Sequence, residues 1–415
     1  MALGAGLQLS QGTYQLAWLL TLLVLLPWLT VSLLSGPRAS ERQLLAGFLA
    51  QSLFLLIHPG FWFRDQDRGM PIFLALSLAA GGVAAVGWGR KRATIALSFS
   101  IAALLLARLL VLAESPQPNI DVFSIGTLGA ERWLSGVNPY LSEYPDIYHG
   151  KSGYRAVYLY WPSGLYLQSL ARWLGGDIRL AFVACEALAA LCLFHWFPTR
   201  SVAVRLLWLN LWLSCPASLV MLENSWIDTF LLFFLVLMAT AWRARRALLL
   251  GLAAGCLLAT KQYAPFFAAI FGAAIGANWR LRQTAAAMAT SIMTGLLLFA
   301  PFLIDHPLQF YESTVAAVGE LPMRKDGLTL QSLLWNEWHI SVSQSAVALL
   351  YLASALLLTG LVWRRPYLQM VFLALAIFMT VFCLFGKQAF LNYYYLLWFF
   401  FWAAAYTRSP ARETL

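Results

Sequence analysis

Long runs of apolar residues, separated by short polar segments, follow one another along most of this chain. Many runs reach the roughly 18–20 residues that a helix needs to cross about 30 Å of hydrocarbon. The pattern therefore predicts membrane-spanning helices. The expected spans are residues 14–35, 43–62, 71–88, 93–113, 156–174, 178–197, 226–242, 283–303, 342–363, 367–385 and 390–407.

Two further apolar regions do not read as ordinary single spans. Residues 247–277 are interrupted by Lys261, Gln262 and Pro265, and a charge in the middle of a bilayer costs several kcal/mol. We therefore expect two short helices that meet at a polar turn. Residues 201–224 form either one span or a short pair hinged at Pro216. The predicted fold is an all-α, polytopic transmembrane bundle of roughly 13 to 15 spans with two large external loops.

Composition supports a membrane protein and excludes other classes. The chain has 415 residues, of which 61% are hydrophobic and 11% charged, and one soluble core cannot bury so much apolar surface. Its cysteines all lie in apolar runs without metal-type spacing, so neither zinc nor redox chemistry is indicated. The first apolar run is long enough to cross a bilayer and lacks a preceding basic region, so we expect no cleaved signal peptide.

Basic residues cluster in short loops, and such loops stay on the cytoplasmic side of a membrane. This rule places residues 114–155, residues 304–341 and the segment GKQAFLN on the opposite face. The net charge of +10 then reflects topology and anionic lipid, and no nucleic-acid partner is expected. The number of crossings between residues 178 and 242 stays open, and with it the side of Arg200 and Arg205. The clusters are Arg90, Lys91, Arg92; Arg243, Arg245, Arg246; Arg280, Arg282; Arg364, Arg365; and Arg408, Arg412.

Any chemistry is expected in the two long loops, which share one face. Asp121 begins an amphipathic segment, residues 121–134, whose pattern predicts a helix lying flat at the membrane surface. Asp121 is either a first-turn acid favoured by the helix dipole or a general base that meets a lipid-borne substrate. The two interpretations are compatible, because a capping position also fixes the carboxylate.

Several short motifs follow one another along the chain. LSGVNPY at residues 134–140 and YLYWPSGLY at 158–166 follow Asp121, and CPASLVMLENSWID, GLAAGCLLATKQYAP, DGLTLQSLLW and NYYYLLW come later. Together they resemble the polyprenyl-phosphate-sugar-dependent glycosyltransferases of the C-type fold, especially the bacterial mannosyltransferases of family 87. That family commonly has two prolines where this chain has Trp161-Pro162. The first three spans look like an addition upstream of its usual arrangement.

The resemblance implies a division of the chain and an activity. Residues 1–92 would be N-terminal transmembrane helices, 93–303 a catalytic transmembrane module with external loop 114–155, and 304–415 an external loop with C-terminal helices. A hexose, mannose by resemblance, would pass from a polyprenyl-phosphate donor to a lipid-linked glycan or other acceptor. The reaction would occur on the non-cytoplasmic face of the cell membrane.

The resemblance makes Asp121 the catalytic base, and chemistry adds the other candidates. A phosphate leaving group needs nearby cations, and Lys261, Arg324 and Lys387 fall on the external side. Lys261 is alternatively a snorkelling lysine at a helix end. No cofactor is implied. Because Asp121 is followed by Val122, an Asp-x-Asp pair is missing and no metal is expected. The remaining substrate-binding candidates are Gln262, Tyr140, Tyr160, Asp228, His306 and His339.

Two other classes of function remain open. A transporter or flippase of a lipid-linked sugar would use polar groups within its spans, and Arg108 and Glu186 lie inside predicted helices. Pairing between them, or snorkelling of Arg108, is the structural alternative to a proton-coupled site. A structural subunit, the third class, would tolerate loss of Asp121.

Overall fold

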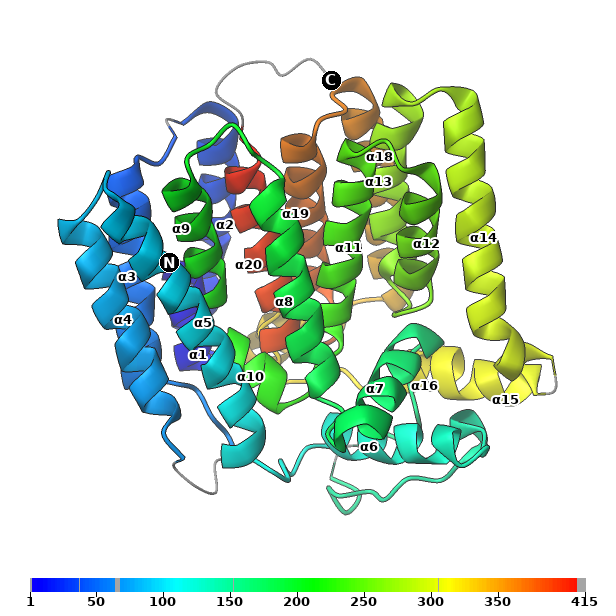
Figure 1. The fold of residues 1–415 in the computed structure, drawn as a ribbon. Coiled ribbons are helices and arrows are strands. Elements are labelled where there is room, and N and C mark those ends of the chain that lie inside the picture. The colour runs from blue at the N-terminus through cyan, green and yellow to red at the C-terminus, as the bar shows by residue number, and fades with distance from the viewer. Residues whose placement is uncertain (1, 37, 64–67, 152, 305, 409–415) are drawn as a thin grey trace.

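The computed structural model describes residues 2–36, 38–63, 68–151, 153–304 and 306–408. Within these ranges the chain forms helices and turns, and one isolated β-bridge joins Thr13 to Gly327. The elements, labelled in Figure 1, are α1 (Ala2–Ser10), α2 (Leu16–Ser35), α3 (Glu41–Ile57), α4 (Met70–Val86), α5 (Lys91–Glu114), α6 (Asp121–Leu134), η1 (Pro139–Leu141), α7 (Pro162–Gly175), α8 (Leu180–His195), α9 (Val202–Leu213), α10 (Ser218–Glu223), α11 (Asp228–Arg243), α12 (Ala247–Leu258), α13 (Ala264–Asn278), α14 (Leu281–Leu303), α15 (Pro307–Tyr311), η2 (Glu312–Ala316), α16 (Ala317–Glu320), α17 (Leu330–Trp338), α18 (Gln344–Arg364), α19 (Leu368–Phe385) and α20 (Leu391–Tyr406).

Five of the described helices are long and apolar enough to cross a membrane: α2, α5, α14, α18 and α19. A sixth is added if the bent pair α7 and α8 is counted as one span. Several other helices are apolar but shorter. The chain is thus an all-helical, membrane-embedded protein, and the larger count of roughly 13 to 15 spans stays a prediction.

The two apolar regions that contain a polar residue or a proline, 247–277 and 201–224, are each divided into two helices. α12 ends at Leu258 and α13 begins at Ala264, so Lys261 lies in the polar turn between two short helices as predicted. In the region 201–224, the structure has a pair of helices, with Pro216 in the turn between α9 and α10. Proline favours such a position because it lacks a backbone N–H and fixes φ.

The expected span 156–174 differs most from the structure. Residues before Pro162 are not helical, α7 has only 14 residues, and it meets α8 at 108°. Pro162 at the start of α7 and Gly176, with φ +81°, at its end explain these bounds, since proline suits the first helical turn and glycine the left-handed cap. α7 packs beside α6 at the end of the bundle (Figure 1).

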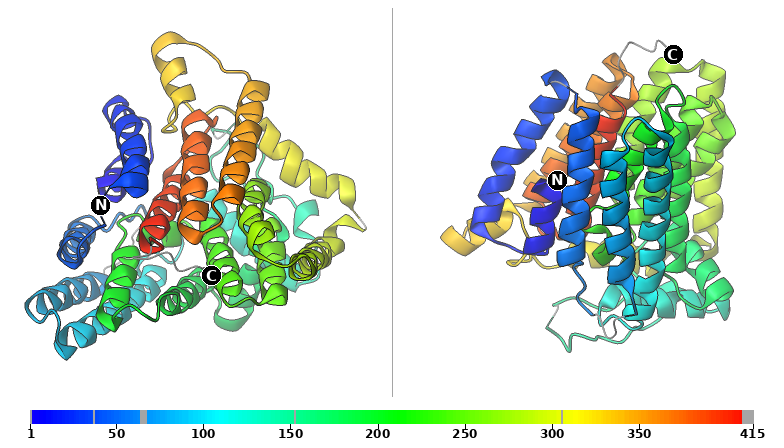
Figure 2. Two further views of the ribbon diagram at one scale, coloured as in Figure 1. Left: turned by 90° about the horizontal axis from the view of Figure 1, so that it is seen from above. Right: turned by 60° about the vertical axis from the view of Figure 1, so that its left-hand side comes forward.

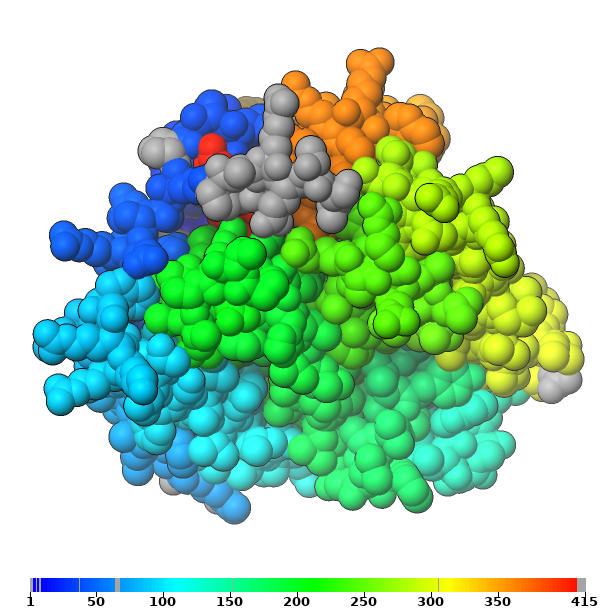
Figure 3. Space-filling view, turned by 45° about the horizontal axis from the view of Figure 1, so that its top comes forward, coloured from blue at the N-terminus to red at the C-terminus, as the bar shows by residue number. Residues whose placement is uncertain are grey.

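The two ends of the bundle differ in character. The loops that follow α4, α11, α13 and α18 lie at one end, and α6, α7, α15 and α16 lie at the other (Figure 1). The first end therefore carries the basic clusters, as the sequence predicts, although Arg412 lies outside the described residues. Figure 3 shows this end tilted toward the viewer, with the green segments of α9–α12 beside the orange segments of α18 and α19.

The path of residues 178–242, open at the level of sequence, is resolved by contacts of Arg200. Its guanidinium donates to the carbonyls of Tyr406 (2.8 Å) and Arg408 (3.3 Å). Arg243 donates to the carbonyl of Trp196 in the same region. Arg200 therefore lies at the same end of the bundle as Arg243 and Arg408, which is the basic end.

The N-terminal helices pack against the last one. α1 and α2 both contact α20, and Figure 2 shows them in blue along one side of the bundle. Gly12, with φ +70°, lies so close to α20 that a Cβ would fall 2.3 Å from the backbone nitrogen of Leu391. The turn between α1 and α2 is therefore held at the end of the bundle opposite the basic clusters.

Candidate active site

A cavity of about 700 Å³ opens among the loops at the end opposite the basic clusters. Its walls come from segments far apart in the chain, including the start of α6, the α12–α13 turn and the loops that precede α17 and α20. The predicted residues that line it are Asp121, Tyr160, Lys261, Gln262, Arg324 and Lys387.

Asp121 begins α6, which lies nearly perpendicular to the bundle helices (Figure 1). Its Oδ1 accepts from the backbone N–H of Val122 (2.8 Å), as expected of a first-turn acid. Two tyrosine hydroxyls also donate to the carboxylate, Tyr154 to Oδ2 (2.6 Å) and Tyr148 to Oδ1 (3.3 Å). Both interpretations of Asp121 are thus compatible with the structure.

Tyr148 and Tyr154 hold the carboxylate as hydrogen-bond donors. Burial, together with the charge of Asp121, raises the pKa of Tyr148 to about 12. The same two causes raise the pKa of Tyr154 still further. Both hydroxyls therefore keep their protons at neutral pH. Sequence reasoning missed these residues, because nothing in their spacing indicates which loop tyrosines fold back onto Asp121.

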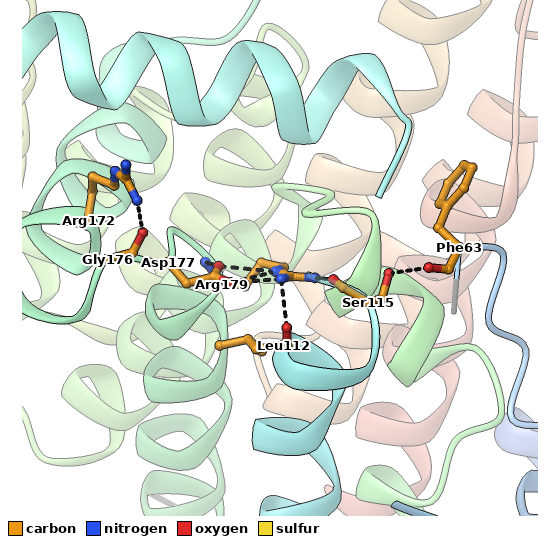
Figure 4. A network of polar contacts seen from close by, with 7 residues as sticks. All are labelled: Phe63, Leu112, Ser115, Arg172, Gly176, Asp177 and Arg179. Carbon is orange, nitrogen blue, oxygen red and sulfur yellow. Dashed lines mark hydrogen bonds and ion pairs between the residues drawn. The ribbon is translucent and has the colours of Figure 1, made fainter. Parts of the chain in front are cut away.

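A buried arginine, Arg179, joins the end of α5 to the segment before α8 (Figure 4). The Nη1 of Arg179 donates to the carbonyl of Ser115 (2.7 Å) after α5, while its Nη2 donates to Asp177 (2.7 Å) before α8. The guanidinium also stacks over the ring of Phe123 in α6, 4.9 Å from its centroid. Charge-assisted hydrogen bonds are strong when buried, so this network fixes the backbone that carries Asp121.

Lys261 forms an ion pair at the cavity wall. Its Nζ donates to both carboxylate oxygens of Asp228, at 3.0 and 2.9 Å. Asp228 is buried behind the cavity lining, where it also accepts from the hydroxyl of Tyr263 and from Nδ2 of Asn392 (2.8 Å). The predicted residue Asp228 thus positions Lys261, and the ammonium lies 4.8 Å from the ring centroid of Tyr393.

Gln262 and Lys387 join the loops around the cavity. Nε2 of Gln262 donates to the carbonyls of Leu159 and Thr314, each at 2.7 Å. Nζ of Lys387 donates to the carbonyls of Val318 (3.1 Å) and Gly319 (2.8 Å). Burial lowers the pKa of Lys387, since its partners are neutral.

Arg324 is the third cation of the lining. Its Nε and Nη2 donate to the two oxygens of Asp326, each at 2.8 Å, which raises the pKa of Arg324 and lowers that of Asp326. Its backbone N–H donates to the carbonyl of Lys387 (2.8 Å). The two loops that supply these cations are therefore connected directly.

Tyr140, His306 and His339 do not line the cavity. Tyr140 is buried, and its hydroxyl donates to the carbonyl of Tyr160 (2.9 Å), so it supports a lining residue from behind. His306 is exposed before α15, and His339 is exposed after α17, with its ring centroid 6.0 Å from that of Trp335. The two histidines thus lie away from Asp121's cavity.

The N-terminal helices contribute to the cavity, which sequence reasoning did not anticipate. Gln11 and Thr13, in the α1–α2 turn, and Trp62, after α3, are part of its lining. The backbone N–H of Tyr14 donates to the carbonyl of Asp326 (2.7 Å), next to the Thr13–Gly327 bridge. The turn between α1 and α2 is thus joined directly to the loop before α17.

No group of three histidine, cysteine, aspartate or glutamate side chains among the described residues is arranged to hold a metal ion. Comparison of the chain with models of protein families, with curated proteins and with solved structures finds no match. The cavity and the physical chemistry of its side chains are therefore the features of this protein that bear on its function.

Proposed function

We propose that the protein is a multi-pass membrane glycosyltransferase that takes one hexose from a polyprenyl-phosphate donor. The acceptor is a lipid-linked glycan or another hydroxyl compound on the non-cytoplasmic face of the cell membrane. Mannose is the proposed sugar because of the motifs that resemble family 87 mannosyltransferases. The C-type fold of that family is part of the same proposal.

One observation carries the proposal: a single cavity among apolar helices contains an ordered carboxylate and three cations from distant segments. Asp121 supplies this carboxylate, and Lys261, Arg324 and Lys387 supply the cations; a second lining carboxylate, Asp326, is paired with Arg324. A general base and a group of cations are what attack by a hydroxyl and departure of a phosphate require. These side chains lie at one end of the helices, and a lipid headgroup at the end of the bundle would be within their reach.

In the proposed reaction, Asp121 removes the proton from the acceptor hydroxyl as its oxygen attacks the anomeric carbon. The new carbon–oxygen bond forms while the bond to the phosphate oxygen breaks, and the polyprenyl phosphate leaves with that electron pair. Attack opposite the leaving group inverts the anomeric configuration. The proton ends on Asp121, and Arg324 and Lys387 stabilise the additional negative charge on the phosphate.

The direct test is transfer of labelled mannose from polyprenyl-phosphate-mannose to lipid-extractable product by membranes that contain the protein. Asp121→Asn should reduce transfer at least about a hundredfold, as expected for loss of a general base. Glu143→Gln is the matched control, since it removes an exposed carboxylate from the same loop outside the cavity. Its transfer should equal that of the wild type.

Two results would contradict the proposal in different ways. Equal transfer by the wild type and Asp121→Asn would make Asp121 only a first-turn acid. Movement of a lipid-linked sugar across the membrane, without a new glycosidic bond, would instead favour the transporter or flippase alternative.

A further inference from the structure

We propose that Trp62 and Trp226 form a subsite for a sugar ring in the cavity wall. Both residues line the cavity, and their rings meet edge to face, with centroids 5.3 Å apart and an interplanar angle of 84°. They come from distant parts of the chain, the loop after α3 and the turn before α11. We assign this subsite to a sugar of the acceptor glycan, an assignment that rests on the proposed function.

Trp62 is held in place by a buried carboxylate. Oε2 of Glu223 accepts from the backbone N–H of Trp62 (2.8 Å), and Oε1 accepts from that of Phe63 (2.9 Å). The hydroxyl of Ser115 donates to the carbonyl of Phe63 (3.0 Å), as Figure 4 shows. Glu223 is fully buried, and burial of a charge is costly unless hydrogen bonds compensate it. This clamp fixes the two-residue segment that carries the indole.

An edge-to-face aromatic pair provides two surfaces at right angles. The C–H faces of a sugar ring are apolar and pack on an aromatic face, while its hydroxyls need polar partners at the edges. The cavity supplies such partners, because Gln11, Thr13 and Asp121 line it as well. Thr13 Oγ1 donates to the carbonyl of Ser10 (2.6 Å), which leaves its oxygen as an acceptor.

A lipid chain is the other apolar ligand that fits such a wall, and the polar side chains of the lining favour the sugar. Three apolar lining residues, Phe266, Val347 and Phe382, come from α13, α18 and α19, on other elements than the two tryptophans, while Ile120 and Val122 flank Asp121 at the start of α6. Gln11 and Thr13, by contrast, are polar lining residues, and Trp62 comes from the same N-terminal part of the chain. A hydrocarbon chain would leave those polar groups without partners, which is unfavourable.

Binding of a defined probe to the full-length protein tests the subsite without requiring turnover. Octyl α-mannoside, below its micelle concentration, is added to the protein in lipid nanodiscs, and saturation-transfer NMR measures its dissociation constant. Trp62→Leu keeps apolar bulk but removes the aromatic face, so binding should weaken by about tenfold. Trp62→Phe keeps an aromatic face and should retain most of the affinity.

Two controls complete the design. Trp173→Leu removes a tryptophan that is 71% exposed on α7 and lies outside the cavity lining, so its affinity should be unchanged. Octanol carries the same chain without the sugar and should not displace the mannoside. Saturation of the sugar C–H protons, rather than of the octyl protons, identifies the part of the probe that contacts the aromatic wall.

The outcomes separate this inference from the proposed function. Equal affinity in Trp62→Leu and wild type, displacement by octanol, or failure of the wild type to bind would each overturn the sugar subsite. Mannose transfer that proceeds normally in Trp62→Leu would leave the glycosyltransferase proposal intact while removing the subsite. Trp62-dependent binding without any transfer would keep the subsite and reject the transferase.

Discussion

The pairs Arg108–Glu186 and Lys261–Asp228 are both buried, but their cations have different surroundings. The Nε of Arg108 lies 2.6 Å from Glu186, and the two side chains are 0% and 2% exposed. The other guanidinium nitrogens donate to backbone carbonyls, Nη1 to Leu104 (3.1 Å) and Nη2 to Leu213 (2.9 Å). Protein groups therefore surround this cation on every side.

The Lys261–Asp228 pair is as close, yet its cation lines the cavity. Asp228 is enclosed by Tyr263 and Asn392, whereas Lys261 is 6% exposed and lies within 5.6 Å of the ring centroid of Tyr160. Burial alone thus does not distinguish a structural pair from a pair at a site. The distinction lies in whether a ligand can reach the cation.

Loss of the structural pair should have the largest effect on stability. Glu186→Gln leaves the Arg108 guanidinium buried without its anion, which should lower the free energy of unfolding by about 3–5 kcal/mol. Chemical unfolding in detergent measures this loss. Transfer per folded molecule should remain near the wild-type value, and the double change Arg108→Met, Glu186→Leu should recover most of the stability. If Glu186→Gln instead kept normal stability but lost transfer activity, the Arg108–Glu186 pair would have a role in the reaction.

Loss of the anion at the cavity should reduce activity more than stability. Asp228→Asn keeps an acceptor for Tyr263 but weakens the hold on Lys261, and hydrogen bonds to charged groups contribute about 1.5–3 kcal/mol. We expect the KM for the polyprenyl-phosphate donor to rise about ten- to a hundredfold, with a smaller change in the acceptor KM. A parallel rise of both constants, or a loss explained by unfolding alone, would contradict the positioning role.

The smallest effect is expected from Lys387, which has neutral partners in place of a carboxylate. Because burial lowers its pKa, this ammonium loses its proton at a lower pH than an ordinary lysine. If the charge of Lys387 contributes to mannose transfer, the transfer rate should be highest below that pKa and should decline as the pH rises through it. Lys387→Arg should remove the alkaline decline in a pH–rate profile, and persistence of the decline would assign it to another group.

Local features of the fold followed from the sequence, and relations between distant segments did not. The break at Lys261 was predicted and the hinge at Pro216 was one of two alternatives, since charge and proline act within a few residues. The orientation of α7 was not predicted, because its 14 residues are apolar enough for part of a span. Its packing against α6, which no pattern within α7 reveals, decides that it lies across the end of the bundle.

The candidate site shows the same division. Asp121 could be singled out because it begins an amphipathic segment soon after a long apolar run. Asp228 and Lys261 were each noticed, but their pairing joins residues 33 positions apart and depends on how α11 and α12 pack. The contribution of Trp62 depends on Glu223, 161 residues away. Such contacts are properties of the folded chain rather than of any sequence window.

The turn that carries residues 223–228 links several parts of the molecule. Glu223 holds the loop after α3, Trp226 lines the cavity and Asp228 holds Lys261, while Ser225 between them has a left-handed backbone with φ +56°. An insertion or deletion of one residue here would disturb all three connections at once. A change of length in this turn would therefore disturb more of the molecule than a change of any one of its side chains.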